Sequence, residues 1–267
     1  MEYKEIQFDV QDGVARVTLN RSDIRNAVTG EEMIRELEAA CDRINNDQRI
    51  AVLVLTATDP AFSAGGNIKD MLHKKGMFGG SPVAVMENYR KQVQRIPRAI
   101  YNIEVPSIAA VNGPAVGAGC DLALMCDMRI ASEKASFAES FLNVGIIPGD
   151  GGAFFLPRLV GQAKAAEMTF TGQTVSASEA ARIGLVNHLV SHDSLIGAAM
   201  DLAHRIAAKP GPALRMSKRL LRLSQHGTME QILEQSAAYQ ALCHSTEDHI
   251  EALQAIFEKR EPRFEGR

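Results

Sequence analysis

Short apolar runs alternate with longer stretches of helical periodicity over about the first 200 residues of the chain. Runs that are apolar at nearly every position are typical of strands covered on both faces, as in a parallel sheet. Helical periodicity predicts one helix over about 29–44, opened by a capping box of Thr29 and Glu32, and another over about 83–102. The alternation predicts an α/β fold with parallel strand pairing. The expected strands are 14–19, 51–56, 107–111, 128–131 and 135–138.

Beyond residue 162 the periodicity is almost entirely helical, with one apolar run at 185–190 as the exception. This change in pattern predicts an α/β core over residues 1–200 and a helical C-terminal region over residues 201–267. Helices are expected there at 194–208, 210–225, 228–243 and 246–259.

The charge balance gives no sign of a nucleic-acid partner or of a membrane surface. The formal net charge is −3 over 267 residues, and no basic surface is interleaved with aromatic side chains. Basic residues do gather between positions 205 and 222, and we interpret them as a solvated helix face rather than as an anion site. They are Arg205, Lys209, Arg215, Lys218, Arg219 and Arg222.

The cysteines show neither metal-binding nor redox spacing, so we expect reduced thiols and a cytoplasmic protein. The N-terminal stretch MEYKEIQFDV lacks the apolar centre of a signal peptide, and no stretch suits a membrane span. The cysteines are Cys41, Cys120, Cys126 and Cys243.

Several common catalytic motifs are missing from the sequence. Gly113, Gly117 and Gly119 do not complete a dinucleotide-binding fingerprint. A phosphate-binding loop, a nucleophile elbow and an HExxH zinc motif are also absent from the sequence. We therefore predict no metal site and no permanently bound cofactor.

Two stretches of small residues each follow a buried strand. FSAGGN (62–67) comes after 51–56, and GPAVGAG (113–119) comes after 107–111. In an open α/β sheet, ligands bind beyond the carboxyl ends of the strands, and small side chains let them approach backbone N–H groups. A helix that begins near Ala118 would leave its first N–H groups free at the positive end of its dipole. One N–H from each stretch would form a two-donor site for a developing oxyanion.

Asp121 and Asp150 are the candidate acid–base residues. Asp121 lies one helical turn after Ala118, where it would either stabilise the helix dipole or exchange a proton beside the oxyanion site. Asp150, in PGDGG, has a similar ambiguity, because an aspartate between glycines is usually part of a turn. Two carboxylates at apolar loop–helix junctions would serve as an acid–base pair.

Six segments, in order, resemble the enoyl-CoA hydratase/isomerase (crotonase) superfamily: GVARVTLNRSDIRNAVT, DPAFSAGGNIKDM, VPSIAAVNGPAVGAGCDLALMCDMRIAS, ASFAESFLNVGIIPGDGG, TGQTVSASEAARIGLVNHLV and EKREPRF. The resemblance covers nearly the whole chain. It implies a spiral of ββα units with a C-terminal helical region that joins subunits into trimers or hexamers. It also implies an acyl thioester as the substrate, with coenzyme A present as part of that substrate.

The resemblance further implies roles for individual residues. It places the two oxyanion-hole N–H groups at Ala64 and Ala118, and an acid or base at Asp121, aimed at carbons two and three of the acyl chain. Arg25 to Ala27 resembles the segment that lies along the phosphates and pantetheine of coenzyme A. Contacts with the coenzyme or the acyl group are also implied for Ala64, Gly65, Gly66, Asn67, Ile68, Phe141, Phe257 and Lys259, the last two sometimes serving a neighbouring subunit.

The chain departs from typical hydratases at both acidic positions. These enzymes have glutamate where this chain has Asp121, and a second glutamate where it has Phe141. Glu139, two residues earlier, would face the same side of an extended segment as Phe141 and could replace the missing acid. Asp150 could replace it as well.

The resemblance implies an enoyl-CoA hydratase, which adds or removes water at a 2-enoyl-CoA, and it leaves two alternatives open. Dienoyl-CoA isomerases of the superfamily have aspartate at the positions of Asp121 and Asp150. The first alternative is therefore an enoyl- or dienoyl-CoA isomerase that moves a proton with this pair. The second is a catalytically silent member that binds acyl-CoA or RNA, and the charge balance argues against RNA.

Overall fold

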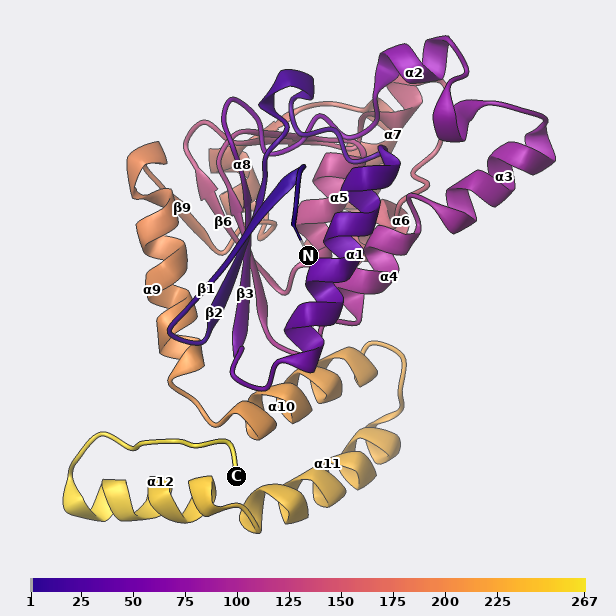
Figure 1. The fold of residues 1–267 in the computed structure, drawn as a ribbon. Coiled ribbons are helices and arrows are strands. Elements are labelled where there is room, and N and C mark those ends of the chain that lie inside the picture. The colour runs from indigo at the N-terminus through magenta and orange to yellow at the C-terminus, as the bar shows by residue number, and fades with distance from the viewer. Residues whose placement is uncertain (1) are drawn as a thin grey trace.

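The main sheet has six strands in the order β1-β2-β3-β4-β6-β9. The computed structural model describes residues 2–267, and Figure 1 shows this sheet with helices on both sides. β1 pairs antiparallel with β2, and every later pair in this sheet is parallel, which confirms the expected α/β fold. The strands are β1 Ile6–Gln11, β2 Val14–Leu19, β3 Val52–Ala57, β4 Ser107–Val111, β6 Met128–Ser132 and β9 His188–Val190.

Alternate side chains of the central strands enter two different cores. Leu53 and Leu55 of β3 join the core beneath α1, whereas Val52 and Val54 pack with the side chains of α9. This alternation explains why β3 is buried at every position and apolar at nearly all of them. One face is covered by α1 Glu31–Asn46, α4 Arg95–Tyr101 and α5 Ala118–Met125, and the other by α9 Leu195–Ala207.

A smaller sheet, in the order β5-β7-β8, joins the segments that follow the central strands. Ser63, after β3, forms an isolated parallel bridge with Ala115 of β5, so the two small-residue stretches lie side by side. The strands of this smaller sheet are β5 Pro114–Val116, β7 Ser136–Ala138 and β8 Val175–Ser176. The other helices of the body are α2 Ile68–Leu72, α3 Pro82–Lys91, α6 Gly152–Val160, α7 Gln162–Thr171 and α8 Ala177–Arg182.

The predicted capping box at the start of α1 is wrong. The helix begins at Glu31 after Gly30, and no side chain caps it. The hydroxyl of Thr29 instead accepts the N–H of Asn67 at 3.2 Å. Thr29 therefore joins the loop before α1 to the loop before α2 and does not cap α1.

The single helix predicted over 83–102 is two helices, α3 and α4. Pro97 has no N–H, and in a continuous helix its ring would clash with the carbonyl of Val93. The chain leaves the helical conformation at Gln92, with φ −119° and ψ −100°. Of the apolar run at 185–190, only 188–190 forms a strand, β9, which pairs with β6.

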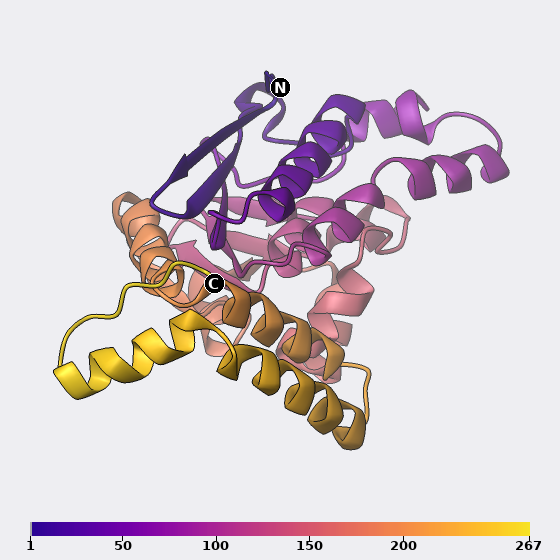
Figure 2. The ribbon, with the colours of Figure 1, turned by 60° about the horizontal axis from the view of Figure 1, so that its bottom comes forward.

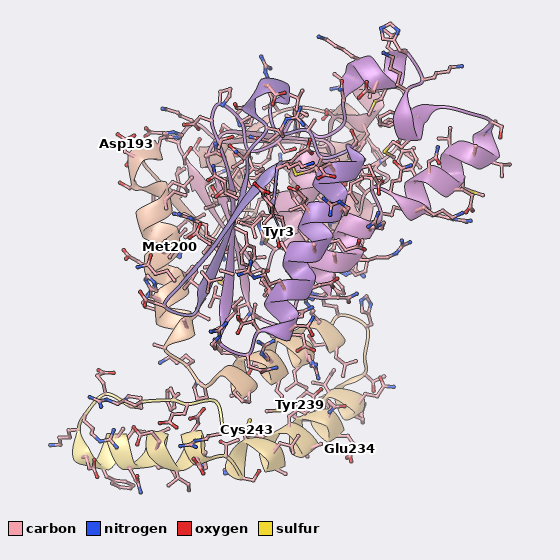
Figure 3. The ribbon with its side chains drawn as sticks, in the orientation of Figure 1. Tyr3, Asp193, Met200, Glu234, Tyr239 and Cys243 are labelled. Atoms are coloured by element: carbon pink, nitrogen blue, oxygen red, sulfur yellow. The ribbon has the colours of Figure 1, made fainter. Side chains whose placement is uncertain are left out.

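The C-terminal helices leave the body as an extended arm (Figure 2). Figure 3 labels Glu234, Tyr239 and Cys243 on this arm and Met200 on α9, which stays against the sheet. The expected division at residue 200 falls inside α9, a helix buried against the sheet on one side. The arm consists of α10 Gly211–Leu223, α11 Met229–His244 and α12 Glu247–Glu258.

The predicted solvated basic face is confirmed only in part: Arg205, Lys209 and Arg219 are exposed, whereas Arg215 and Lys218 are buried. The ammonium of Lys218 is 2.7 Å from the carboxylate of Asp127 and donates to the carbonyl of Val105 at 2.6 Å. Arg215 donates to the carbonyl of Ile50 at 3.1 Å. Because buried cations need such partners, these two side chains anchor α10 to the body.

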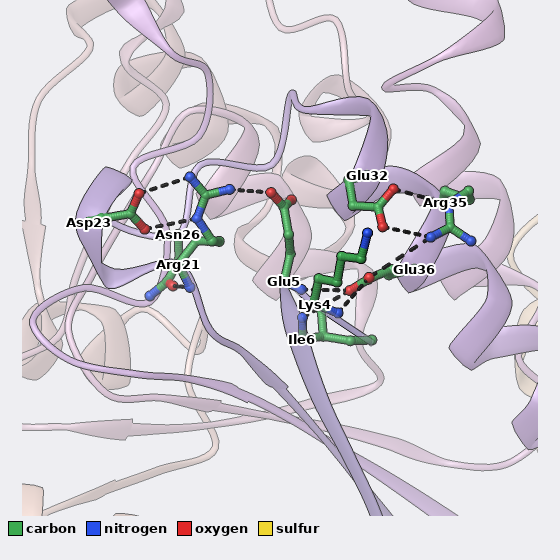
Figure 4. Close-up of polar contacts among 9 residues, drawn as sticks. All are labelled: Lys4, Glu5, Ile6, Arg21, Asp23, Asn26, Glu32, Arg35 and Glu36. Atoms are coloured by element: carbon green, nitrogen blue, oxygen red, sulfur yellow. Dashed lines mark hydrogen bonds and ion pairs between the residues drawn. The ribbon is translucent and has the colours of Figure 1, made fainter. Parts of the chain in front are cut away.

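A buried carboxylate fastens the start of β1 to α1 (Figure 4). Glu36 accepts the backbone N–H groups of Lys4, Glu5 and Ile6 at 2.7, 2.8 and 3.0 Å. Arg21 pairs with Glu5, the residue before β1, and so ties the loop that follows β2 to the start of that strand. The loop that carries Arg25 therefore starts from a fixed position.

Candidate active site

A cavity of about 70 Å³ opens beyond the carboxyl ends of β3 and β4. Its walls come from the segment after β3, the start of α5, the stretch between Ser140 and Asp150, and α3. Most of its walls are apolar, and among the described residues that line it Asp150 is the single carboxyl. The predicted site residues on its walls are Ala64, Gly66, Ile68, Ala118, Phe141 and Asp150.

Ala118 begins α5 and presents a free amide to this cavity. Gly117 before it has φ 53° and ψ −124°, a conformation that glycine adopts readily. Within residues 2–267 no acceptor receives the Ala118 N–H. This N–H also lies at the positive end of the helix dipole, which favours an anion in front of it.

The amide of Ala64 is not free, which corrects the predicted oxyanion donor. Its N–H donates to the carbonyl of Arg25 at 2.9 Å. Two residues further on, Gly66 lines the cavity, and none of the described residues accepts its N–H. Gly66, rather than Ala64, therefore offers the second amide beside Ala118.

The loop before α1 holds this segment in place. Asn26 is fully buried, and its side-chain amide donates to the carbonyls of Thr58 and Ala61 at 2.8 Å each. The N–H of Val28 donates to the carbonyl of Gly65 at 2.9 Å. The backbone around Gly66 is thus tied on both sides to the loop that carries Arg25.

Asp150 lies at the turn before α6 and is 5% exposed. Burial, followed by the nearby Asp121 carboxyl, raises the pKa of Asp150 to about 7. The side chain of Gln94 donates to the carbonyl of Gly149 at 3.0 Å and so supports this turn. A carboxyl with a pKa near neutrality exchanges protons efficiently at the pH where most enzymes act.

Asp121 and Glu139 are fully buried and do not line the cavity. One carboxylate oxygen of Asp121 accepts the N–H of Gly152 at 2.9 Å. Burial and the neighbouring Glu139 carboxyl raise the pKa of Asp121 well above its usual range. Burial likewise raises the pKa of Glu139. The structure therefore brings the three predicted acids together but exposes only Asp150 to the cavity.

The remaining predicted coenzyme contacts are divided between two places. Arg25, Ala27, Gly65 and Asn67 lie in the two loops behind the cavity wall and do not line it. Phe257 is 85% exposed at the end of α12, and Lys259 follows that helix directly. In Figure 1 this end of the arm lies far from α2 and α3, so a single chain does not bring Phe257 to the cavity.

Sequence reasoning did not identify the wall formed by α3 and the segment before it. Tyr89 lines the cavity, and its pKa is raised by burial and by the Asp150 carboxyl. Met77, Phe78 and Val93 lie on the same wall. Their apolar character was visible in the sequence, but nothing local indicated that this face would meet Asp150.

A larger cavity of about 500 Å³ lies between α10 and the body. Asp127, the single carboxyl among the described residues that line it, is 2.7 Å from Lys218 and 3.3 Å from Arg222. Because this carboxyl is already paired with two cations, the smaller cavity is the better candidate for chemistry.

The chain matches known proteins over nearly its whole length. The sequence pattern of the enoyl-CoA hydratase/isomerase family matches residues 9–267. The chain belongs to this family. It is 34% identical over its full length to the short-chain-enoyl-CoA hydratase of Clostridium acetobutylicum, covering 98% of that protein. It is 36% identical to the 2,3-dehydroadipyl-CoA hydratase of Escherichia coli, with 98% of this chain and 99% of that protein covered.

The fold of this family member also matches solved structures. The crystal structure of an enoyl-CoA hydratase from Bacillus anthracis superposes with a TM-score of 0.92 at 31% identity, covering 99% of this chain and 100% of that one. The predicted crotonase-like fold with a C-terminal helical region is therefore confirmed. Among residues 2–267, no group of three or more histidine, cysteine or acidic side chains is placed to hold a metal ion. None of the helices in this range is long and apolar enough to cross a membrane.

Proposed function

We propose that this chain hydrates 2-enoyl-CoA thioesters with short, uncharged acyl chains, with Asp150 as the carboxyl that contacts the acyl group. The observation that carries the proposal is that Asp150 lines the same cavity as the free amides of Gly66 and Ala118. The family membership and the hydratases named above support the same reaction. Coenzyme A enters as part of the substrate, and the chemistry needs no permanently bound cofactor.

The two amides would stabilise the thioester enolate. When water adds to carbon three, negative charge develops on the thioester oxygen. Donors aimed at that oxygen lower the barrier, each by about 3–4 kcal/mol. The Gly66 and Ala118 N–H groups suit this role because no protein acceptor within residues 2–267 competes for them.

Asp150 would move the proton in both directions. As a carboxylate it accepts a proton from the attacking water while the water oxygen bonds to carbon three. As a carboxylic acid it then returns a proton to carbon two of the enolate. One molecule of water is added and the carboxylate is regenerated, so the reaction balances. A pKa near 7 suits a group that must serve as base and then as acid.

The cavity favours short acyl chains without a charged end. Its volume is about 70 Å³, and no lysine or arginine is among the described residues on its walls. A relative named as a crotonyl-CoA hydratase, from Syntrophomonas wolfei, is 34% identical over 99% of this chain. An acyl chain ending in a carboxylate would find no cationic partner there.

The test is turnover of an enoyl-CoA panel, followed by loss of the conjugated thioester absorbance. We expect crotonyl-CoA to react, longer chains to react more slowly, and 2,3-dehydroadipyl-CoA to react least. Asp150→Asn should lower kcat by ~10²–10⁴-fold. Asp193→Asn, at an exposed site beside α9, is the matched control and should leave the rate unchanged. Lack of turnover across the panel, or a fully active Asp150→Asn enzyme, would contradict the proposal.

A second candidate function is isomerisation of an enoyl-CoA. A single carboxyl in the cavity can take a proton from one carbon of the acyl chain and return it to another, which requires no water. Incubation with a 3-enoyl-CoA separates the two functions. Appearance of the conjugated thioester without added hydratase indicates isomerase activity, whereas a 3-hydroxyacyl product from a 2-enoyl-CoA indicates hydration.

We also propose that the arm joins copies of this chain into trimers or hexamers. Its helices expose many large apolar side chains, a pattern that favours contact with another protein surface. Assembly would also bring the exposed Phe257 and Lys259 of one copy to the coenzyme of another. Light scattering at micromolar concentration tests the proposal, and a monomer would contradict it. The exposed residues include Leu221, Met229, Leu233, Leu242, Ile256 and Phe257.

A further inference from the structure

The carboxyl groups of Asp121 and Glu139 meet beneath the cavity, at the first turn of α6. A methyl group built on Gly152 would lie 2.3 Å from Oδ1 of Asp121 and 2.8 Å from Oε2 of Glu139. Gly152 is two residues after Asp150. Both side chains are fully buried, and neither is on the cavity wall.

These two carboxyls have too few hydrogen-bond donors for two negative charges. The Gly152 N–H donates to Oδ2 of Asp121 at 2.9 Å. No N–H or hydroxyl of residues 2–267 donates to Oδ1 of Asp121 or to either oxygen of Glu139. Two adjacent buried carboxylates repel each other strongly, so one of them retains a proton. That proton forms an O–H···O⁻ bond, among the stronger hydrogen bonds in proteins.

We infer that Asp121 and Glu139 act as one buried pair that shares a single proton, positions the Asp150 turn through Gly152, and exchanges no proton with the acyl chain. The inference rests on the proposed function, because Asp150 is the carboxyl that the pair positions. Asp121 and Glu139 are thus positioning residues, and the hydrogen bond from Gly152 is the link between them and the site.

The pair also contributes to the charge around Asp150. The titratable groups near Asp150 are Asp121 on α5, Glu139 before the turn at Ser140–Val144, and Tyr89 on α3. The Cys120 thiol lies against Glu139. A pair that shares one proton keeps one negative charge, and this charge raises the pKa of Asp150 in the same direction as burial does.

Amide substitutions distinguish such a pair from two catalytic acids. In Asp121→Asn, the side-chain NH₂ replaces the shared proton as donor to Glu139, and the amide oxygen still accepts the Gly152 N–H. In Glu139→Gln, the new NH₂ donates to the Asp121 carboxylate. Each single variant keeps one negative charge and one hydrogen bond within the pair. The double variant removes the charge.

The activity test compares these variants on crotonyl-CoA across a range of pH. We expect each single variant to keep kcat within about tenfold of wild type, with little change in the midpoint of its pH profile. The double variant should move that midpoint to lower pH, because Asp150 loses a negative neighbour. A loss of about a hundredfold or more in either folded single variant overturns the inference, since losses of ~10²–10⁴-fold are typical of a removed acid or base. If Asp121→Asn does not fold, Glu139→Gln carries the same test.

A measurement independent of activity uses infrared spectroscopy in an Asp150→Asn background, where Asp150 cannot contribute. At pH 8 the shared proton should give the carbonyl band of a protonated carboxyl, and the band should disappear when Asp121→Asn is added. Absence of the band in the Asp150→Asn parent overturns the inference. A fully active Asp150→Asn enzyme instead contradicts the proposed function, whatever the infrared spectrum shows, so the two failures are distinguishable.

Discussion

A methyl group built on Gly65 would lie 2.3 Å from the carbonyl oxygen of Val116 and 2.9 Å from the amide nitrogen of Ala118. The segment that carries Gly66 therefore rests directly on the turn that starts α5. Gly65 also has φ +77°, in the left-handed region that favours glycine. This backbone contact sets the spacing between the two amides of the proposed oxyanion hole.

Gly65→Ala should therefore lower kcat by about a hundredfold or more, because one of the two backbone segments has to move and displacements near 1 Å have effects of that size. Gly184→Ala is the matched control. Gly184 has nearly the same backbone conformation, φ +78°, but nothing lies within 4 Å of the added methyl. It should reproduce the conformational strain without the loss of rate. Equal losses of kcat in both variants would show that strain alone is responsible.

The rate should depend on pH through Asp150. Hydration starts from its carboxylate form, so kcat/KM should fall as the pH decreases through about 7, the pKa of the buried carboxyl. The measurement is kcat/KM for crotonyl-CoA between pH 5 and 9. A profile that stays flat from pH 5 to 8 would exclude a titrating group with this pKa. Any residual kcat/KM of Asp150→Asn should not decrease as the pH falls through about 7.

The elements that the sequence predicted well are those whose burial is decided locally. β3 and β4 are apolar at nearly every position because both of their faces are covered, and this pattern is visible in the sequence alone. The two small-residue stretches were placed correctly after these strands, since the chain must turn there and side chains larger than glycine would clash. The same reasoning located the start of α5 at Ala118.

Details that depend on distant partners could not be predicted. Whether the amide of Ala64 or that of Gly66 is free depends on the carbonyl of Arg25, which lies 39 positions before Ala64. Asp121 accepts the N–H of Gly152, 31 positions later, and does not line the cavity. No local pattern encodes either contact. The sequence therefore predicted the correct segment for the first oxyanion donor, but the wrong amide within that segment.

Asp150 should make the protein less stable as the pH rises. The pKa of Asp150 is about 7 in the folded chain, whereas its ordinary value is 3.8. Between these two pH values the folded state therefore binds more protons than the unfolded state does. Stability then decreases as the pH rises toward and through 7, by an amount on the order of 4 kcal/mol for a pKa difference of this size. Asp150→Asn removes this contribution. Urea unfolding at pH 5 and pH 8 should show a smaller decrease for Asp150→Asn than for wild type. An equal decrease in both proteins would contradict a raised pKa of Asp150 in the folded chain.

The final prediction concerns Lys218 and how the arm is attached to the body. The side chain is 5% exposed, and burial lowers its pKa to about 8 even though Asp127 is only 2.7 Å away. Lys218→Ala leaves the partly buried Asp127 without its nearest cation and opens a gap beside α10, so the free energy of unfolding should fall by about 3 kcal/mol.

Arg219 provides the matched control for Lys218, because it is the next residue on the same helix and also forms an ion pair, with Glu104. Its side chain is 54% exposed, so solvent screens the pair, and Arg219→Ala should cost less than about 1 kcal/mol. Urea unfolding of the two variants under identical conditions measures the difference. Similar losses in both would mean that Lys218 acts as an ordinary surface charge. A loss confined to Lys218→Ala would establish that the buried Lys218 ammonium, paired with the partly exposed Asp127, attaches α10 to the body.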